Sequence, residues 1–498
     1  MDFFSGLTTV FQAANLLLLI LGVILGIIVG AIPGLTATLA ISLLLPFTFS
    51  LEASSALIML VGIYVGGIYG GSITAILLRT PGTPGAAATA LDGYPLMQKG
   101  QGGRALGIAT TASFTGGIIS AAFMIFLSPA ISSFALKFSS AEFFALAFFG
   151  LTIIFSVSGG SLLKGAMAGC IGLVINTVGL DRIVAYPRFT FGSRSLLVGF
   201  PLLPSIIGLF ALSEVLRLFL ADPKNKDEAP LKVGRILPRW QDLVHLKWIF
   251  LKSSIIGTLI GALPGAGANI ASFVAYNEAK RSSKTPEEFG KGIIDGVAAP
   301  EASNNAVTGG ALIPMLTLGV PGDSVTAVLL GALTIQGLQP GPLLFRDHPG
   351  VINAIFAGII VANVLMLIFG LTLSTIFARI ATIKRTTLAP IIAIFSLIGA
   401  FAGEGSFWHM TIAAGFGICG YFLEKNQFPL APIALAIVLG PLAESNFRTA
   451  LIRSNGNPLI FLSSPISVFF LAVAIGSIFF SLRKQRKAGS AKARSEAA

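Results

Sequence analysis

The chain has 498 residues, of which 54% are hydrophobic and only 11% charged, and its formal net charge is +12. A soluble protein carries about 25% charged residues, so this composition excludes a cytosolic globular enzyme, and the apolar content excludes a disordered chain. The length suits roughly a dozen membrane spans of about 20 residues with short loops. We therefore expect an all-α polytopic membrane protein with about 10–14 spans.

Apolar runs occupy most of the chain, beginning at 12–31. No Lys or Arg precedes this first run, so it lacks a signal-peptide pattern and is expected to stay in the membrane. Further runs lie at 36–49, 53–78, 105–130, 140–157, 161–180, 195–220, 249–263, 267–277, 303–319, 324–336, 351–378, 386–402, 407–423, 429–443 and 465–482. Those at 36–49, 267–277 and 324–336 are too short to span a bilayer alone. Because they adjoin Pro-Gly pairs, we expect half-helices or re-entrant hairpins there.

Basic residues lie mainly in short loops between these runs. They gather at Lys99 and Arg104, at 224–247, at 280–291, at 379–385 and in the C-terminal tail. Such loops are cytoplasmic by the positive-inside rule, which also places the C-terminus in the cytoplasm. The loops around Glu52, Asp347, Glu404 and Glu444 then lie outside. The positive charge therefore indicates membrane topology rather than a nucleic-acid-binding face.

Two stretches of the sequence resemble each other. Residues 24–40, ILGIIVGAIPGLTATLA, match residues 255–271, IIGTLIGALPGAGANIA, in the order of their small residues and prolines. Further along, Gly-Gly and Pro-Gly pairs recur in the same order, at 70–71 and 81–82 and again at 309–310 and 321–322. The loop 46–53 has no Lys or Arg, whereas its counterpart 280–291 is basic, so equivalent loops are expected on opposite sides of the membrane. This pattern predicts inverted structural repeats, the architecture of many secondary transporters.

The repeats divide the chain into four parts. Residues 1–221 form the first repeat half of the membrane domain, and 222–248 form a basic cytoplasmic linker. Residues 249–482 form the second repeat half, and 483–498 form a basic cytoplasmic tail.

Four Pro-Gly breaks, beginning at Pro33, Pro81, Pro264 and Pro321, mark the candidate substrate site. Proline removes a backbone donor and glycine permits positive φ, so each pair interrupts a helix and leaves backbone groups that hydrocarbon cannot satisfy. The N–H groups that begin the next half-helix suit an anion such as a carboxylate. The alternative is that the breaks are caps and kinks whose Ser and Thr side chains bond to their own helix. The candidate substrate-binding residues are Gly34, Thr36, Thr38, Arg79, Thr80, Gly82, Thr83, Gly85, Gly265, Gly267, Asn269, Gly322 and Ser324.

Arg79 is the only basic residue among the first 98 and follows an apolar run. An arginine buried in a membrane usually faces a transport pathway or pairs with an acid. The alternative is an interfacial residue whose guanidinium reaches the water.

A second polar set offers oxygen ligands for a coupling cation. Asn304 and Asn305 precede the second Gly-Gly pair, and Asp323 and Thr326 follow the last Pro-Gly pair. Amide, carboxylate and backbone oxygens suit a hard cation such as Na⁺. Asp295 and Glu301 belong to the same polar set, and the alternative for the asparagines is hydrogen bonding between helices. We predict ion binding by Asn304, Asn305, Asp323 and Thr326, with Na⁺ or H⁺ as the coupling ion, no other metal and no organic cofactor.

Enzyme motifs are absent from the sequence. It has no P-loop, no HExxH and no GxSxG, and its three histidines are dispersed. Cys170 and Cys419 lie inside apolar runs and are expected to pack there. We predict that the chain is not an enzyme.

Three long motifs carry a resemblance to a known family. They are GAIPGLTATLAISLLLPFTF (30–49), YGGSITAILLRTPGTPGAAATALDGYPLMQKGQGGRALG (69–107) and GALPGAGANIASFVAYNEAKRSSKTPEEFGKGIIDGVAAPEASNNAVTGGALIPMLTLGVPGDSVTAVLLGAL (261–333). The chain resembles the large membrane subunit (TctA) of tripartite tricarboxylate transporters over about 15 to 425. The resemblance implies a secondary transporter in the bacterial inner membrane that works with a small four-helix membrane subunit and a periplasmic solute-binding protein. It also implies uptake of citrate or related tri-, di- or monocarboxylates, driven by a Na⁺ or proton gradient.

The expected function is therefore that of a binding-protein-dependent permease that imports organic carboxylates by cation symport. Two alternatives stay open. One is a stand-alone carboxylate symporter that needs no binding protein, and the other is a passive anion channel that uses the same helix ends.

Overall fold

The computed structural model describes residues 3–157, 162–220, 236–380, 385–402 and 405–496. Their only strands are a short antiparallel pair, β1 (Gly179–Leu180) and β2 (Pro187–Arg188). Seven of the described helices are long and apolar enough to cross a membrane, and shorter apolar helices accompany them. The chain is an all-α polytopic membrane protein, as its composition predicts.

The first half begins with α1 and ends with α10. Its helices are α1 (Phe3–Val10), α2 (Ala13–Ala31), α3 (Ala37–Leu44), η1 (Leu45–Thr48), α4 (Ala53–Leu78), η2 (Pro84–Ala87), α5 (Ala90–Gln98), α6 (Gly102–Ala135), α7 (Ser140–Val157), α8 (Leu162–Asn176), η3 (Arg194–Leu196), α9 (Leu202–Ile206), the π-helical η4 (Ile207–Leu212) and α10 (Ser213–Leu220).

The second half begins with α11 and ends with α20. Its helices are α11 (Trp240–Gly261), α12 (Gly267–Ser282), η5 (Pro286–Glu288), α13 (Asp295–Leu318), α14 (Ser324–Ile335), α15 (Pro342–Asp347), α16 (Pro349–Ile380), α17 (Arg385–Ala402), α18 (Phe407–Lys425), α19 (Ala431–Arg453), η6 (Pro458–Leu462) and α20 (Pro465–Glu496). The end of the predicted linker, from Trp240, already belongs to α11, and residues 222–235 lie outside the described residues. The predicted tail continues α20.

Glycines bring α2 and α4 into backbone contact. A Cβ on Gly22 would lie 2.4 Å from the carbonyl oxygen of Met59, and one on Gly30 would lie 2.2 Å from that of Gly67. The residue numbers of the contacting positions therefore increase in the same direction along both helices. This means that α2 and α4 run parallel, although they follow each other in the chain. The intervening α3 and η1 return the chain to the starting side, as expected of a re-entrant hairpin.

The second half repeats this arrangement. Gly257 of α11 contacts Ser303 of α13, and Gly261 contacts Val307, so these two helices are also parallel. The short α12 between them provides the return. The predicted match between residues 24–40 and 255–271 thus corresponds to two equivalent helix–break–helix units.

The two units point in opposite directions. α6 is antiparallel to α4, because Tyr69 bonds to Thr110 at 2.8 Å while Leu77 packs against Gly102. α6 is parallel to α13, because Gly116 contacts Ala302 and Ser120 contacts Gly309 further along both helices. α2 and α4 therefore run against α11 and α13, which is the inverted repeat that the loop charges predict.

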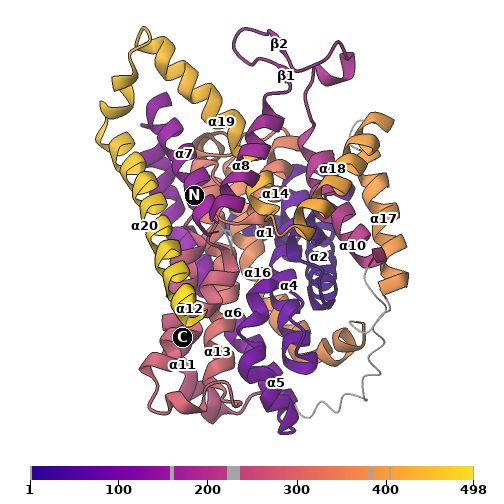
Figure 1. The fold of residues 1–498 in the computed structure, drawn as a ribbon. Coiled ribbons are helices and arrows are strands. Elements are labelled where there is room, and N and C mark those ends of the chain that lie inside the picture. Colours follow the sequence, from indigo (N-terminus) through magenta and orange to yellow (C-terminus); the bar gives the residue numbers. More distant parts are fainter. Residues whose placement is uncertain (1–2, 158–161, 221–235, 381–384, 403–404, 497–498) are drawn as a thin grey trace.

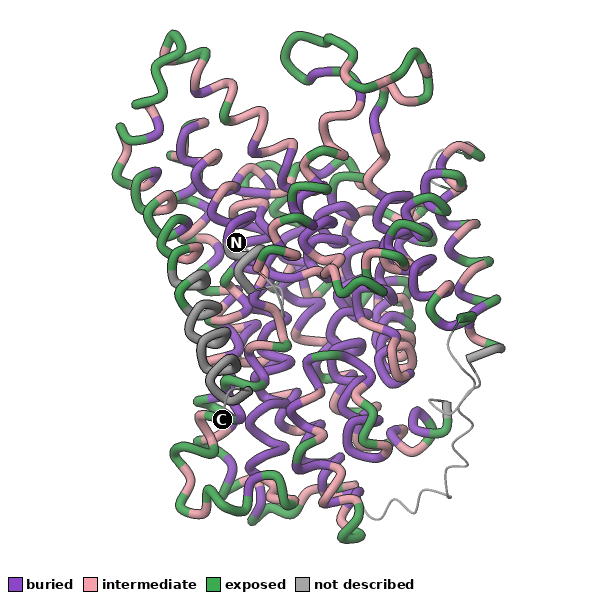
Figure 2. The backbone as a smooth tube through the Cα atoms, in the orientation of Figure 1, coloured by how far each residue is buried: buried purple, intermediate pink, exposed green. Residues whose placement is uncertain are grey.

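The outer helices are arranged with the same symmetry. α7 and α8 pack against α19 of the other half, whereas α17 and α18 pack against η4 and α10. In Figure 1, α7 and α20 form one flank and α17 and α18 the other, with α4, α6 and α13 between them. Figure 2 shows that buried backbone fills this centre, while the β1–β2 hairpin at one end is largely exposed.

Three features differ from the sequence expectations. Glu444 was expected in or beside a loop, but α19 continues to Arg453 and holds Glu444 within a helix. Cys170 and Cys419 were expected to pack inside, but both are exposed, because α8 and α18 turn these faces to the outside of the helix bundle. The β1–β2 hairpin was not expected, since the run 161–180 reads as one continuous apolar segment.

The close α2–α4 contact gives a stability test. Gly30→Ala would place a Cβ 2.2 Å from the backbone oxygen of Gly67, where neither backbone can move freely, so we expect the folded protein to be lost or its Tm to fall sharply. Gly415→Ala in α18 is the matched control. Its Cβ meets nothing within 4 Å, and alanine is the better helix former by about 1 kcal/mol. Equal Tm values for the two purified variants would contradict the packing described.

Candidate functional site

Within each half, the two Pro-Gly breaks lie against each other. Gly82 packs on the carbonyl of Gly30, and its N–H donates to the carbonyl of Gly71 at 3.2 Å. In the second half, Gly322 packs on the carbonyl of Gly261 and accepts from the N–H of Gly265 at 2.7 Å. Four breaks that are distant in sequence thus form two compact, equivalent clusters.

The two clusters meet at the centre of the molecule. Thr38 and Ser324 share a hydrogen bond of 2.8 Å between the halves. A Cβ on Gly85 would lie 2.3 Å from the amide oxygen of Asn304, so this glycine admits the asparagine of the other half. Within the second half, a Cβ on Gly267 would lie 3.6 Å from the Cβ of Asp323, which is ordinary van der Waals contact. Candidate residues from both repeats therefore lie at one junction.

A cavity of about 340 Å³ opens beside the first cluster. It brings together Gly34, Thr36 and Gly82 from the sequence-based set. Thr36 is the N-cap of α3, and its hydroxyl accepts from the N–H of Leu39 at 3.2 Å. The cavity is also lined by Leu39, Pro81, Pro84, Phe210, Ser213, Glu214, Arg217, Glu424 and Leu430. The positive end of the α3 dipole thus faces a space that polar side chains line.

Arg217 is the basic residue at the cavity, and neither it nor the acidic Glu214 and Glu424 belongs to the set predicted from the sequence. Its guanidinium pairs with Glu214 through contacts of 2.5 and 2.6 Å and donates to the carbonyl of Gly34 at 3.4 Å. The Arg217 side chain is 45% exposed. The signal that could have found it is the spacing Glu214-Val-Leu-Arg217, which places an acid and a base on one face of an otherwise apolar helix.

Other predicted substrate residues lie apart from this cavity. Arg79 and Thr80 are exposed, and Arg79 ends α4 in the left-handed conformation (φ 56°) with its guanidinium 5.8 Å from the centre of the Tyr94 ring. Asn269 is exposed on α12. Thr83 is buried behind the first cluster. A role for these residues in binding stays a prediction.

The predicted ion ligands divide into two kinds. Asp323 and Thr326 form a capping box that begins α14, and the Tyr64 hydroxyl donates to Asp323 at 2.7 Å. Asn304 and Asn305 are fully buried, and the only hydrogen bond of their side chains in the described structure runs from Asn304 to the carbonyl of Ile68 at 3.5 Å. The Asn304 amide oxygen and both polar atoms of Asn305 have no partner. Buried amides without partners cost free energy, so these two residues are the stronger candidates for an absent ligand.

Glu301 lies one helical turn before these asparagines and is fully buried. Its carboxylate accepts hydrogen bonds from Ser72 at 2.5 Å, from Ser113 at 3.0 Å and from Thr89. No Lys, Arg or His among the described residues forms an ion pair with it. The sequence placed Glu301 in the polar set but not among the ion ligands, because its three hydroxyl partners come from distant helices.

Comparison with known proteins agrees with this architecture. Residues 16–435 match the pattern of the Tripartite tricarboxylate transporter TctA family. A protein of Agrobacterium vitis described as "Uncharacterized 52.8 kDa protein in TAR-I ttuC' 3'region" is 37% identical over 491 residues, which are 97% of each chain. A second protein of that organism, "Uncharacterized protein in TAR-II ttuC' 3'region", is 38% identical over 226 residues, 45% of this chain and 93% of its own.

No solved structure matches the chain. The family match covers both repeats, all four breaks and the cavity, and the family is one of transporters and not of enzymes. The chain belongs to the tripartite tricarboxylate transporter TctA family.

Proposed function

We propose that the chain is the permease subunit that carries an organic carboxylate across the bacterial inner membrane by symport with Na⁺ or H⁺. A periplasmic binding protein delivers the substrate, and a small four-helix membrane subunit completes the transporter. The basic loops and the C-terminus face the cytoplasm. Family membership supports a tripartite transporter component.

One observation supports the carboxylate most directly. The N-terminus of α3 and the guanidinium of Arg217, which also pairs with Glu214, lie at one cavity. Backbone N–H groups, a helix dipole and an arginine are the donors that recognise carboxylates. In a bilayer such a polar space is tolerated because it lines a pathway.

The coupling ion is proposed to bind near Asn304 and Asn305. Their unpartnered amide oxygens are suitable ligands, and the buried Glu301 carboxylate supplies negative charge on the same helix. A buried charge without a counter-ion is unfavourable, so a cation or proton at this place offsets a cost that the described residues leave uncompensated.

Reconstitution in liposomes tests the transport function. We expect accumulation of a carboxylate from a panel of citrate, malate and benzoate only when the binding protein, the small subunit and an ion gradient are all present. Accumulation without the binding protein would favour the stand-alone symporter. Flux that equilibrates the acid and ignores the gradient would favour the channel.

The variant Asn305→Ala tests the ion site. Loss of one oxygen ligand is expected to raise the ion concentration needed for half-maximal uptake by about tenfold, the equivalent of 1.4 kcal/mol. Asn277→Ala, at an exposed position on α12, is the control. If the amide served only packing, its removal would leave the ion dependence unchanged and would raise Tm by relieving two unpaired polar atoms.

The variant Glu301→Gln tests the charge in this region. It preserves the shape and an acceptor oxygen for the hydroxyl partners but removes the negative charge, so we expect folded protein that no longer accumulates substrate along an ion gradient. Glu287→Gln, at an exposed position of η5, is the control. Gradient-driven accumulation at the wild-type rate in Glu301→Gln would exclude Glu301 from ion coupling.

A further inference from the structure

A second pair of matching sequences lies outside the Pro-Gly breaks. Residues 200–204 read FPLLP and lead into α9, η4 and α10, while residues 428–432 read FPLAP and lead into α19. Each segment then presents a glutamate followed by an arginine, Glu214 with Arg217 in α10 and Glu444 with Arg448 in α19. Each half therefore carries a Glu–Arg pair in the helix that follows this segment, although the positions counted from the matching segment differ by two residues at the glutamate and by three at the arginine.

The first pair lies at the cavity. Arg217 is held by Glu214 and reaches the carbonyl of Gly34, the residue that follows the first proline break. Glu424, in the last turn of α18, lines the same cavity and is exposed. This mouth of the molecule is open to the surface.

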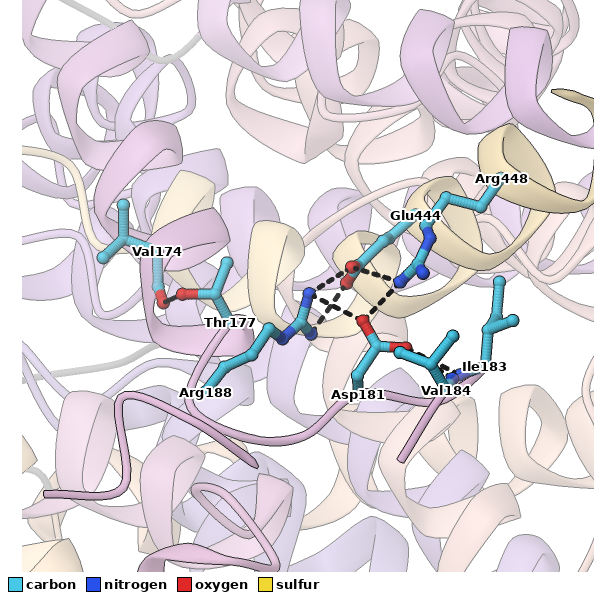
Figure 3. Close-up of polar contacts among 8 residues, drawn as sticks. All are labelled: Val174, Thr177, Asp181, Ile183, Val184, Arg188, Glu444 and Arg448. Atoms are coloured by element: carbon cyan, nitrogen blue, oxygen red, sulfur yellow. Dashed lines mark hydrogen bonds and ion pairs between the residues drawn. The ribbon is translucent and has the colours of Figure 1, made fainter. Parts of the chain in front are cut away.

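The second pair is contacted by the β1–β2 hairpin, as Figure 3 shows, and the side chains of Glu444 and Arg448 are 32% and 30% exposed. Asp181 of the hairpin accepts a hydrogen bond from Arg448, and Arg188 pairs with Glu444 at 2.5 Å and with Asp181 at 3.4 Å. Arg448 also lies 3.7 Å from Glu444. The four charged groups form a closed network between the hairpin and α19.

Asp181 is fixed by its own loop. The backbone N–H groups of Ile183 and Val184 each donate to its carboxylate at 2.9 Å. These bonds, followed by the bond from Arg448, lower the pKa of Asp181 to about 2. A lowered pKa means that the interaction is complete above the ordinary value near 4 and is lost only as the pH falls toward 2. The network therefore holds throughout the physiological pH range.

The two Glu–Arg pairs lie near opposite ends of α8. α8 leads at its C-terminal end into the hairpin, whereas Lys164 near its N-terminal end donates to the carbonyl of Asn426, in the connection that lines the cavity. With a rise of about 1.5 Å per residue, the length of α8 separates these ends by roughly 20 Å. The break at Pro264 lies on the side of the molecule that holds α19. Pro264 and Leu439 of α19 both contact Gly150 of α7.

We propose that the two Glu–Arg pairs are equivalent carboxylate-binding gates at the two mouths of one pathway, and that the hairpin holds the Arg448 gate shut in this structure. The inference rests on the proposed carboxylate transport. At the closed gate, the carboxylate of Asp181 occupies Arg448 in the position that a substrate carboxylate takes when the gate is open. At the open gate, the Arg217 guanidinium is accessible to the carboxylate in transit.

Cysteine labelling tests the gate without requiring transport. In a background in which Cys170 and Cys419 are replaced by serine, Pro84→Cys places a thiol at an exposed position that lines the cavity, and Ala443→Cys places one at the buried residue before Glu444. A membrane-impermeant maleimide is expected to label the first thiol from the α10 side and to leave the second unlabelled. Asp181→Ala is expected to raise labelling of the second about tenfold and to lower that of the first, because the ion pairs of Asp181 with Arg448 and Arg188, which favour this state, are lost.

Unchanged labelling after Asp181→Ala would overturn the proposal that the hairpin holds the Arg448 gate shut. A parallel increase at both thiols would also overturn it, since this result indicates a loosened fold rather than an exchange between two states. Arg182→Ala, at an exposed hairpin position beside Asp181, is the matched control and is expected to change neither thiol.

Protection experiments test the carboxylate contact. Citrate, malate and benzoate are supplied on the α10 side, and at least one of them is expected to slow labelling of Pro84→Cys about tenfold. Arg217→Gln should remove this protection and Arg217→Lys should retain part of it, because lysine keeps the charge but not the bidentate geometry. Arg453→Gln, at the exposed end of α19, should retain it fully.

Absence of protection by all three acids, or full protection in Arg217→Gln, would overturn the binding role. Neither labelling assay needs an ion gradient, a binding protein or the small subunit. If the two thiols change in opposite directions but no gradient-driven uptake occurs, the gates are supported and the proposed symport is wrong. If gradient-driven uptake occurs but the two thiols do not change in opposite directions, the symport is supported and the gates are wrong.

Discussion

The structure depends on where a broken helix can place its backbone inside a membrane. Each Pro-Gly pair leaves carbonyl and N–H groups without intrahelical partners, and hydrocarbon cannot supply them. The chain resolves this problem by pressing breaks of the same half together, so that Gly82 closes on Gly30 and Gly265 donates to Gly322. Because only hydrogen atoms fit at these contacts, the parallel course of α2 and α4 and of α11 and α13 follows from the same glycines.

Much of this organisation is readable from the sequence. Ordered Gly-Gly and Pro-Gly pairs reveal the repeat, because they encode backbone geometry that side-chain hydropathy does not. The sign of the loop charges reveals its inversion. Asn304 and Asn305 stand out because amides are rare in an apolar run, and both are buried with unpartnered atoms.

Other features depend on contacts that no local pattern encodes. Glu301 gathers hydroxyls from Ser72, Thr89 and Ser113, and its environment emerges only when several helices assemble. Arg79 was conspicuous as an isolated charge, yet it is exposed and occupies a left-handed helix end where the second half has Gly319. An isolated arginine in the sequence is therefore a poor guide to the cavity. Arg217, which has an acidic residue nearby, lines it.

The hairpin has a consequence for the energetics of the whole molecule. Two inverted halves with identical contacts would favour neither orientation of the pathway, because exchanging the halves would reproduce the same structure. The segment between α8 and α9 is much longer than its counterpart between α18 and α19, and it adds charged contacts on one face alone. An unliganded population would then be unequally divided, and whatever displaces the hairpin must supply the difference. The hairpin between α8 and α9 thus makes one orientation of the pathway more populated than the other in a nearly symmetric protein.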